Sequence, residues 1–367
     1  MTTNTANFDL SALALKAACP NNEILFDDKG MPSIMVKIPK MTYAQLGLGD
    51  STDVFPAFIV NGQEVNEIYI SKFMNIVQSS RAYSLPGRDY ANNINFENAI
   101  SRCTSKGRGW HLMTAMEWGL LILWCEHNGF IPLGNLAYGK YHTETNYKAI
   151  PLTYGTGTDA GKIYHTAGGT GPLTWFHDGT PGGIADLAGN GWEWTGGIRT
   201  VYGELQVLAN NDAADSNNAQ TAAAATWKAI DAASGTLITP NGEGTTPGSV
   251  KMDFVSSAIK YDTTISSQSD SSRSCAFKNI TYNSETVSAA AVRFLQSIGM
   301  LPITGTLCTT YGNCYFNNGA AERSFFRGGN YTSGYSYSFP SFRGNNARSD
   351  TTTSIGFRSA FVKLPAA

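Results

Sequence analysis

Short apolar runs bounded by Pro or Gly follow the first 32 residues, and they predict strands. The runs are Ser33–Pro39, Phe58–Val60 and Asn66–Ile70. Each is rich in β-branched residues and too short for an ordinary helix, which favours extended structure.

The residues before these runs have a different pattern. Leu10–Ala18 is rich in Ala and Leu and predicts a short helix that Pro20 ends. We therefore expect residues 1–32 to form an N-terminal extension and residues 33–367 to form one folded domain.

Three later stretches have apolar residues at helical spacing. Asn95 is a good N-cap for a helix that stops at Gly107, and Thr114 with Glu117 forms a capping box for a second helix that runs to Gly129. Each of these two helices is expected to pack one face against a sheet. The third helix is predicted within 287–300.

Two tryptophans and a long polar region complete the pattern. Trp118 and Trp124, in the second predicted helix, are expected in the core. Residues 209–235 are rich in Ala, Asn and Asp and predict an inserted helix with loops. Residues 256–281 are rich in Ser and Asp and predict a surface excursion, so insertions are expected near 209–281.

Composition describes a loop-rich globular protein. Of the 367 residues, 42% are hydrophobic and 15% charged, and 38 are Gly, which allows a sizeable core but argues against a helical bundle. The formal net charge is −2 and the basic residues are scattered, so nucleic acid is a poor candidate partner. The first residues lack the pattern of a signal peptide, and no apolar run is long enough to insert into a membrane.

The cysteines are expected to be reduced. A chain without a signal peptide most simply keeps its cysteines as buried thiols. There are six, and Cys308 and Cys314 alone are close enough in sequence to suggest a local bridge.

The segment of 25 residues from Asn330 to Ser354 has the composition of an antibody binding surface. Tyr and Phe supply rigid contact area there, and Ser, Asn and Asp supply adaptable hydrogen bonds. Lys, Glu, Gln, Met and Trp are absent from Arg323 to Val362, and these are the five residues that a codon ending in a pyrimidine cannot encode. A Gly- and Ser-rich surface loop is the alternative interpretation.

Four landmarks occur in order along the chain. They are Met35–Pro39, Gly109–Trp118, Gly183–Trp194, and Arg327–Gly329 with Ile355–Arg358. Together they resemble the formylglycine-generating-enzyme (sulfatase-modifying factor) branch of the C-type lectin fold. The resemblance implies an α+β fold that is rich in loops, with short antiparallel strands and two to three helices.

The resemblance also raises the question of a metal. In that family the loop matching Asn190, Gly191 and Glu193 can hold a structural calcium ion, for which their oxygens are suitable ligands. The alternative is that Glu193 is paired with an arginine or with backbone amides. No cofactor is otherwise required.

The enzymes of this branch place reactive cysteines between the Arg-Gly-Gly and Ile-Gly-Phe-Arg elements, where this chain has none. Related sulfoxide synthases use a histidine cluster. Here His111, His127, His142, His165 and His177 show no ligand spacing, so each is expected to be a core or surface residue. We therefore predict a protein that is not an enzyme, with an enzyme whose ligands are displaced as one alternative.

The same branch contains the variable proteins of diversity-generating retroelements, and this chain looks like one of them. The resemblance implies that Arg327–Gly329 and Ile355–Arg358 form a constant frame, whereas the residues between them vary and bind ligand. The predicted ligand-binding residues are Asn330, Tyr331, Ser333, Tyr335, Tyr337, Phe339, Ser341, Phe342, Asn345, Asn346, Ser349 and Asp350.

This resemblance implies that the protein is part of a phage or prophage virion, which is assembled in the bacterial cytoplasm. The domain would bind a host cell-surface receptor, either protein or glycan, from a tail tip or fibre. Residues 1–32 would contact other virion proteins or form oligomers, with a homotrimer as one possibility. A structural decoration protein of the virion is a further alternative.

Overall fold

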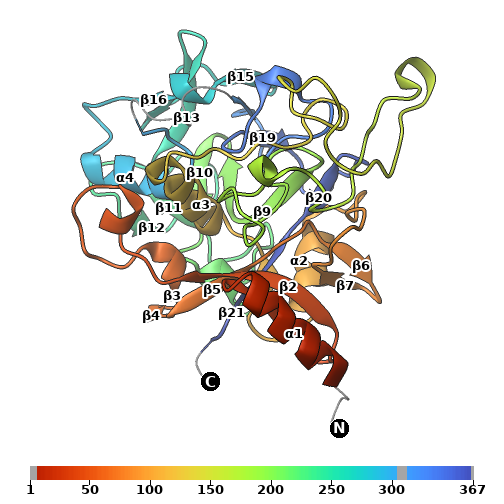
Figure 1. Cartoon of the computed structure of the whole chain (residues 1–367). Helices are drawn as coiled ribbons and strands as arrows, with labels where there is room; N and C mark the ends of the chain where they lie inside the picture. The colour runs from red at the N-terminus through yellow and green to blue at the C-terminus, as the bar shows by residue number, and fades with distance from the viewer. Residues whose placement is uncertain (1–5, 304–311, 365–367) are drawn as a thin grey trace.

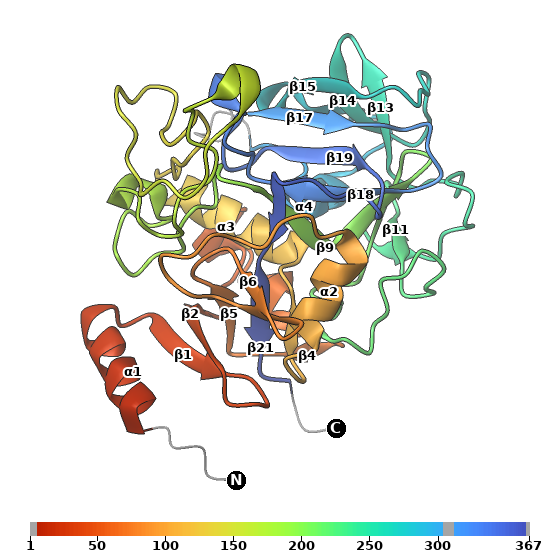
Figure 2. The same cartoon turned by 90° about the vertical axis from the view of Figure 1, so that its right-hand side faces the viewer.

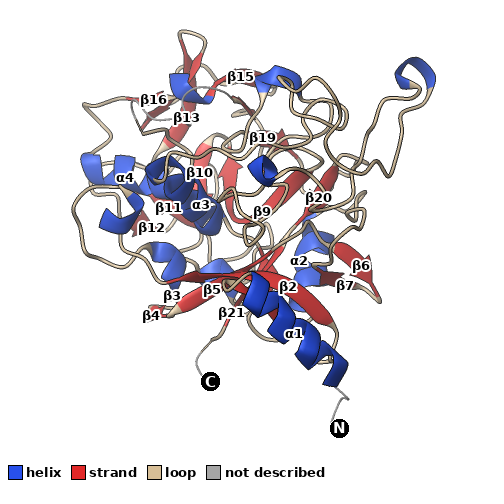
Figure 3. Ribbon diagram, viewed as in Figure 1, coloured by secondary structure: helices blue, strands red, loops and turns tan. Residues whose placement is uncertain are grey.

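A computed structural model describes residues 6–303 and 312–364, and it shows a mixed α+β protein (Figure 1). Two large β-sheets form the centre, and much of the remaining chain is loop (Figure 3). The α-helices of the described residues are α1 (Ala6–Ala18), α2 (Phe96–Thr104), α3 (Ala115–His127) and α4 (Ala289–Ser297). None of these helices is long and apolar enough to cross a bilayer.

The smaller sheet has five strands in the order β1-β2-β5-β21-β8, and every neighbouring pair is antiparallel. The strands are β1 (Asn22–Phe26), β2 (Pro32–Pro39), β5 (Glu67–Ser71), β8 (Trp110–Leu112) and β21 (Ser359–Val362). The prediction that the folded domain begins after residue 32 is therefore wrong. β1 pairs along its whole length with β2, which brings the domain start back to Asn22.

The larger sheet has twelve strands, nine of them in the order β15-β17-β19-β18-β9-β10-β13-β14-β16. β11 and β12 extend from β10, and β20 pairs with β9. The bounds are β9 (Trp192–Val201), β10 (Glu204–Val207), β11 (Lys228–Ile230), β12 (Leu237–Ile238), β13 (Lys251–Val255), β14 (Ala258–Asp262), β15 (Arg273–Ala276), β16 (Thr281–Tyr282), β17 (Asn313–Phe316), β18 (Arg323–Arg327), β19 (Phe342–Asn346) and β20 (Ile355–Phe357). All ten residues of β9 are buried, so this strand forms the middle of the molecule.

Small hairpins complete the strands. They are β3 (Ile59–Val60) with β4 (Gln63–Glu64), and β6 (Ile76–Gln78) with β7 (Arg81–Tyr83). The end of the chain links the two sheets, because β20 joins β9 of the larger sheet and β21, one residue later, lies between β5 and β8.

Local signals decide where the helices begin. Asn95 caps α2 by accepting a hydrogen bond from the backbone N–H of Asn98, and Thr114 and Glu117 form the predicted capping box of α3. The third predicted helix is confirmed as α4.

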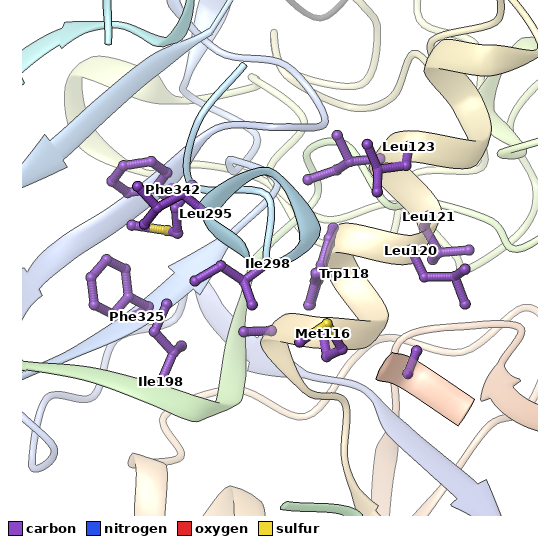
Figure 4. Packing of buried hydrophobic residues seen from close by; sticks show 14 of the residues in the cluster. Met116, Trp118, Leu120, Leu121, Leu123, Ile198, Leu295, Ile298, Phe325 and Phe342 are labelled. Atoms are coloured by element: carbon purple, nitrogen blue, oxygen red, sulfur yellow. The ribbon is translucent and has the colours of Figure 1, made fainter. Parts of the chain in front are cut away.

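The burial of α3 corrects a prediction. We expected one buried face, but nearly every residue from Ala115 to Cys125 is buried, because the larger sheet, α4 and the loops enclose the helix (Figure 4). At Gly119 a Cβ would lie 1.7 Å from the carbonyl oxygen of Ser297, so glycine lets the two helices approach closely. Trp118 is fully buried as predicted, whereas Trp124 is only partly buried.

The region 209–281 is more regular than predicted. Within 209–235 the structure has a short 3-10 helix, Asp212–Ala214, and strand β11, but no α-helix. Residues 256–281 contribute β14, β15 and β16 to the larger sheet instead of forming only a surface excursion. Sheet pairing overrode the local preference of these polar sequences.

Cys19, Cys103, Cys125, Cys275 and Cys314 are buried, as expected, and none of these five is bridged to another. Cys308 lies outside the described residues, so the structure does not test whether it forms a bridge to Cys314.

Candidate functional site

Two buried arginines hold the ends of the Asn330–Ser354 segment. Arg327, just before it, donates to the carbonyl oxygens of Ile298 at 2.9 Å and Gly299 at 3.1 Å. It has no carboxylate partner among the described residues, and burial lowers its pKa to about 10.

Arg358, just after the segment, is held by a carboxylate. Its Nε and Nη2 donate to the two oxygens of Glu193 at 2.9 and 2.8 Å, and the remaining donors reach the carbonyl oxygens of Ser71 and Ala185. Burial raises the pKa of Glu193, and the neighbouring guanidinium opposes that shift. Arg358 thereby connects β9 of the larger sheet to β5 of the smaller sheet.

This pairing does not fit the calcium hypothesis at Asn190, Gly191 and Glu193. Both oxygens of Glu193 already accept from Arg358, and the side-chain oxygen of Asn190 accepts from the backbone N–H of Thr166 at 2.9 Å. Within the described residues no group of three or more His, Cys, Asp and Glu could hold a metal ion. The arginine-paired alternative is the one that the geometry favours.

The histidines have partners of their own. His111 contacts Glu117 at 2.8 Å inside the core, and His165 lies between Tyr90 at 3.0 Å and Asp89 at 3.0 Å. The ring of His177 accepts a hydrogen bond from the backbone N–H of Ile184, and burial lowers its pKa to about 4. His127 is exposed and His142 partly buried.

The first half of the segment turns inward. Gly328 and Gly329 have φ of +90° and +91°, and a Cβ on Gly328 would lie 2.6 Å from the carbonyl oxygen of Leu187. These glycines therefore permit a sharp turn against the core. Asn330 and Ser333 close the following turn through their side chains at 2.8 Å.

Four predicted ligand-binding residues are buried, which leaves them almost no surface for a ligand. They are Tyr331, Phe339, Ser341 and Phe342. The ring of Tyr331 stacks on Tyr164 with centroids 4.4 Å apart, and Phe339 packs 5.6 Å from Trp118. Phe342 begins β19 and points into the core near Phe325 and Leu295 (Figure 4). They are buried because α3, the loop around Tyr164 and the inner face of the sheet need apolar partners.

The other predicted residues reach the surface to different extents. Tyr335 is 75% exposed, the largest fraction for any large hydrophobic residue reported among the described ones. Ser349 is exposed, and Asn330, Ser333, Tyr337, Asn345, Asn346 and Asp350 are partly exposed. Asn345 and Asn346 lie on β19, which Figure 2 shows between β17 and β18 on the face toward the viewer.

Two residues absent from the predicted set complete this face. Tyr315 on β17 stacks on Tyr337 with centroids 5.9 Å apart and an interplanar angle of 8°. Arg343 on β19 lies 4.9 Å from the ring of Tyr315 and 5.7 Å from that of Trp192, with no hydrogen bond or ion pair to the described residues. Alternation along β19 could have identified Arg343, because Phe342 and Gly344 face inward. No sequence signal joined Tyr315 to the segment.

The outer-face surface is defined here as Tyr315, Tyr335, Tyr337, Arg343 and Asn345. It combines aromatic rings, an amide and a guanidinium that are exposed or partly exposed. Burial raises the pKa of the Tyr337 hydroxyl well above its usual range, so this group stays neutral and can donate hydrogen bonds.

Comparison with known proteins does not identify a family for this chain. No protein-family model and no curated protein sequence matches the chain. A solved structure of the "Major Tropism Determinant U1 Variant" is 12% identical, with a TM-score of 0.30, over 93% of this chain and 71% of that one. A likeness this low establishes neither a shared fold nor a shared function.

Proposed function

We propose that the protein is a non-enzymatic binding protein whose outer-face surface attaches a phage to a receptor on the host cell. The observation that carries this is the division of the Asn330–Ser354 segment. Its inward side chains complete the core, whereas Tyr335 projects from the 3-10 helix Gly334–Ser336, and Arg343 and Asn345 lie on the outward face of β19. A surface supported in this way can change its side chains without disturbing the fold.

The chemistry of the surface suits recognition rather than catalysis. Tyrosine rings offer large contact area with few rotatable bonds, and amides adapt their hydrogen bonds to different partners. The restriction to residues with pyrimidine-ending codons supports a segment that is rewritten genetically. A C-type lectin-like fold and membership of the retroelement variable proteins are parts of this proposal.

The N-terminal segment is proposed to join the protein to other virion proteins or to further copies of itself. Figure 2 shows α1 at one edge of the molecule, next to β1. Leu10 and Leu13 on α1 are 69% and 67% exposed, which leaves two apolar side chains three residues apart for a partner. Several copies on one virion would raise the avidity of a weak site.

The test is attachment of the purified protein to host cells. Tyr335→Ala should weaken attachment, by about 1–3 kcal/mol for each site if this ring is an anchor. Its unfolding curve should be unchanged. Tyr282→Ala removes an exposed tyrosine on β16, outside the outer-face surface, and should leave attachment intact. Full attachment of a variant that combines Tyr335→Ala with Arg343→Gln would show that the receptor binds elsewhere.

A further inference from the structure

A second candidate site lies outside the Asn330–Ser354 segment, at the ends of β9, β10, β13 and β14. It is a pocket of about 680 Å³, within the size range of small-molecule sites. One wall is the loop 243–248, the other is the loop 263–268, and Tyr202 in the β9–β10 turn lies between them. The β13–β14 hairpin that carries these loops is near the top of Figure 1.

A buried lysine holds the two walls together. Lys251 is 7% exposed, and its amine donates to the carbonyl oxygens of Thr246 at 2.9 Å and Thr263 at 3.0 Å, one from each loop. It also donates to the hydroxyl of Ser249 at 2.8 Å. All the hydrogen bonds of the amine are therefore made within the protein, and none remains for a ligand.

Buried carboxylates fix each wall separately. Glu204 accepts from the backbone N–H of Thr246 at 2.9 Å and the hydroxyl of Ser249 at 2.7 Å. Asp253 accepts from the backbone N–H groups of Ser266 and Ser267, both at 2.9 Å. The pocket is thus formed before any ligand arrives, which reduces the entropy lost on binding.

The groups that remain available are an aromatic ring and neutral or negative oxygen atoms. Tyr202 is 39% exposed, and its hydroxyl has no partner among the described residues. The amide nitrogen of Gln268 donates to the carbonyl oxygen of Asn318 at 3.1 Å, which leaves its amide oxygen for a ligand. Thr264 and Glu243 are exposed, and no cation pairs with Glu243 in the part of the chain that the structure describes.

We propose that this pocket binds a neutral saccharide unit. The ring of Tyr202 would pack on the apolar face of the sugar, and Thr264, Gln268 and Glu243 would bond its hydroxyl groups. An anionic ligand is disfavoured because Lys251, the one cation among the described lining residues, is already saturated and Glu243 would repel it. Sugar hydroxyls are donors and match the acceptors that remain.

This site rests on residues outside the outer-face surface, but the two are physically connected. Loop 263–268 continues to Ser272, whose hydroxyl accepts a hydrogen bond from Asn345 at 2.9 Å. The inference does not need the proposed function to be correct.

The experiment is saturation-transfer NMR on the full chain with single sugars at millimolar concentration. The probes are the methyl glycosides of glucose, galactose and mannose, with glucuronate as an anionic and glucosamine as a cationic comparison. We expect transfer to at least one neutral glycoside and little to glucuronate. No transfer to any neutral glycoside, or transfer to glucosamine alone, would overturn the proposal.

Substitutions of residues that line the pocket test whether the sugar binds there. Tyr202 has a φ of +46°, a conformation that Asn tolerates well, so Tyr202→Asn removes the ring while keeping the turn. This variant and Gln268→Ala should each weaken sugar binding roughly tenfold, which is about 1.4 kcal/mol. Tyr282→Asn is the matched control, because Tyr282 is 40% exposed and does not line the pocket.

Two outcomes separate this inference from the proposed function. Tyr335→Ala should leave sugar binding unchanged even if it abolishes attachment to cells. If sugar binding survives both Tyr202→Asn and Gln268→Ala in folded protein, the pocket is not the site. Thermal unfolding of each variant checks that the fold is retained.

Discussion

The two halves of the Asn330–Ser354 segment differ in composition and in burial, because all five aromatic residues lie in the first half and none in the second. From Asn330 to Phe342 the large side chains mostly turn inward, whereas from Arg343 to Ser354 the chain lies on the surface. The inward half passes over α3 and the loop at Tyr164, which offer apolar partners. In the outward half, one face of β19 packs against the core and the other face is partly exposed. Packing therefore decides which residues of the segment can bind, because Tyr335 is exposed whereas Tyr331 and Phe339 are buried.

The largest expected effect is at the frame that holds both halves. Arg358→Ala should lower the free energy of unfolding by about 3–5 kcal/mol, because it leaves Glu193 buried without its partner. Chemical denaturation measures the loss. Arg358→Ala with Glu193→Gln should recover part of it, and a single variant as stable as the parent would show that the pair is not structural.

Phe342→Ala tests the inward half. This side chain is fully buried, and its removal should cost about 3 kcal/mol or more through lost burial and a cavity. Asn345→Ala, three residues later and on the opposite face of the same strand, is the surface control. Equal loss in both variants would remove the distinction between the two halves.

Tyr331→Ala is expected to have a smaller effect. The residue is 5% exposed and stacks on Tyr164, so its truncation should cost about 1.5–3 kcal/mol of stability. We also expect weaker attachment to cells, in proportion to the unfolded fraction. If attachment falls while the unfolding curve stays the same, Tyr331 belongs to the binding surface after all.

The smallest expected effect is in the outward half. Asn345→Ala loses one partly exposed hydrogen bond to Ser272 and should change stability by less than about 0.5 kcal/mol. Attachment to cells is the informative measurement, since the side chain lies on the outer-face surface. A large destabilisation would mean that β19 depends on this surface contact.

Local sequence signals predicted local features well. Asn95, Thr114 and Glu117 act as caps because a cap needs only the residues of one turn. The two arginines were expected to be structural, and both are buried. The apolar run of α3 did not reveal that elements distant in sequence cover the helix on every side. The strands of region 209–281 were missed for the same reason, since their partners are remote.

The sequence by itself determined where α2 and α3 begin and the unusual composition of the Asn330–Ser354 segment, and it led us to expect buried thiols. Only the tertiary structure decided that Tyr331, Phe339, Ser341 and Phe342 are buried and that Glu193 pairs with Arg358. It alone brought Tyr315 to Tyr337 and Tyr202 to the loops of the pocket. The physical reason is that capping and composition act over a few residues, whereas burial depends on which strands become neighbours in the sheets.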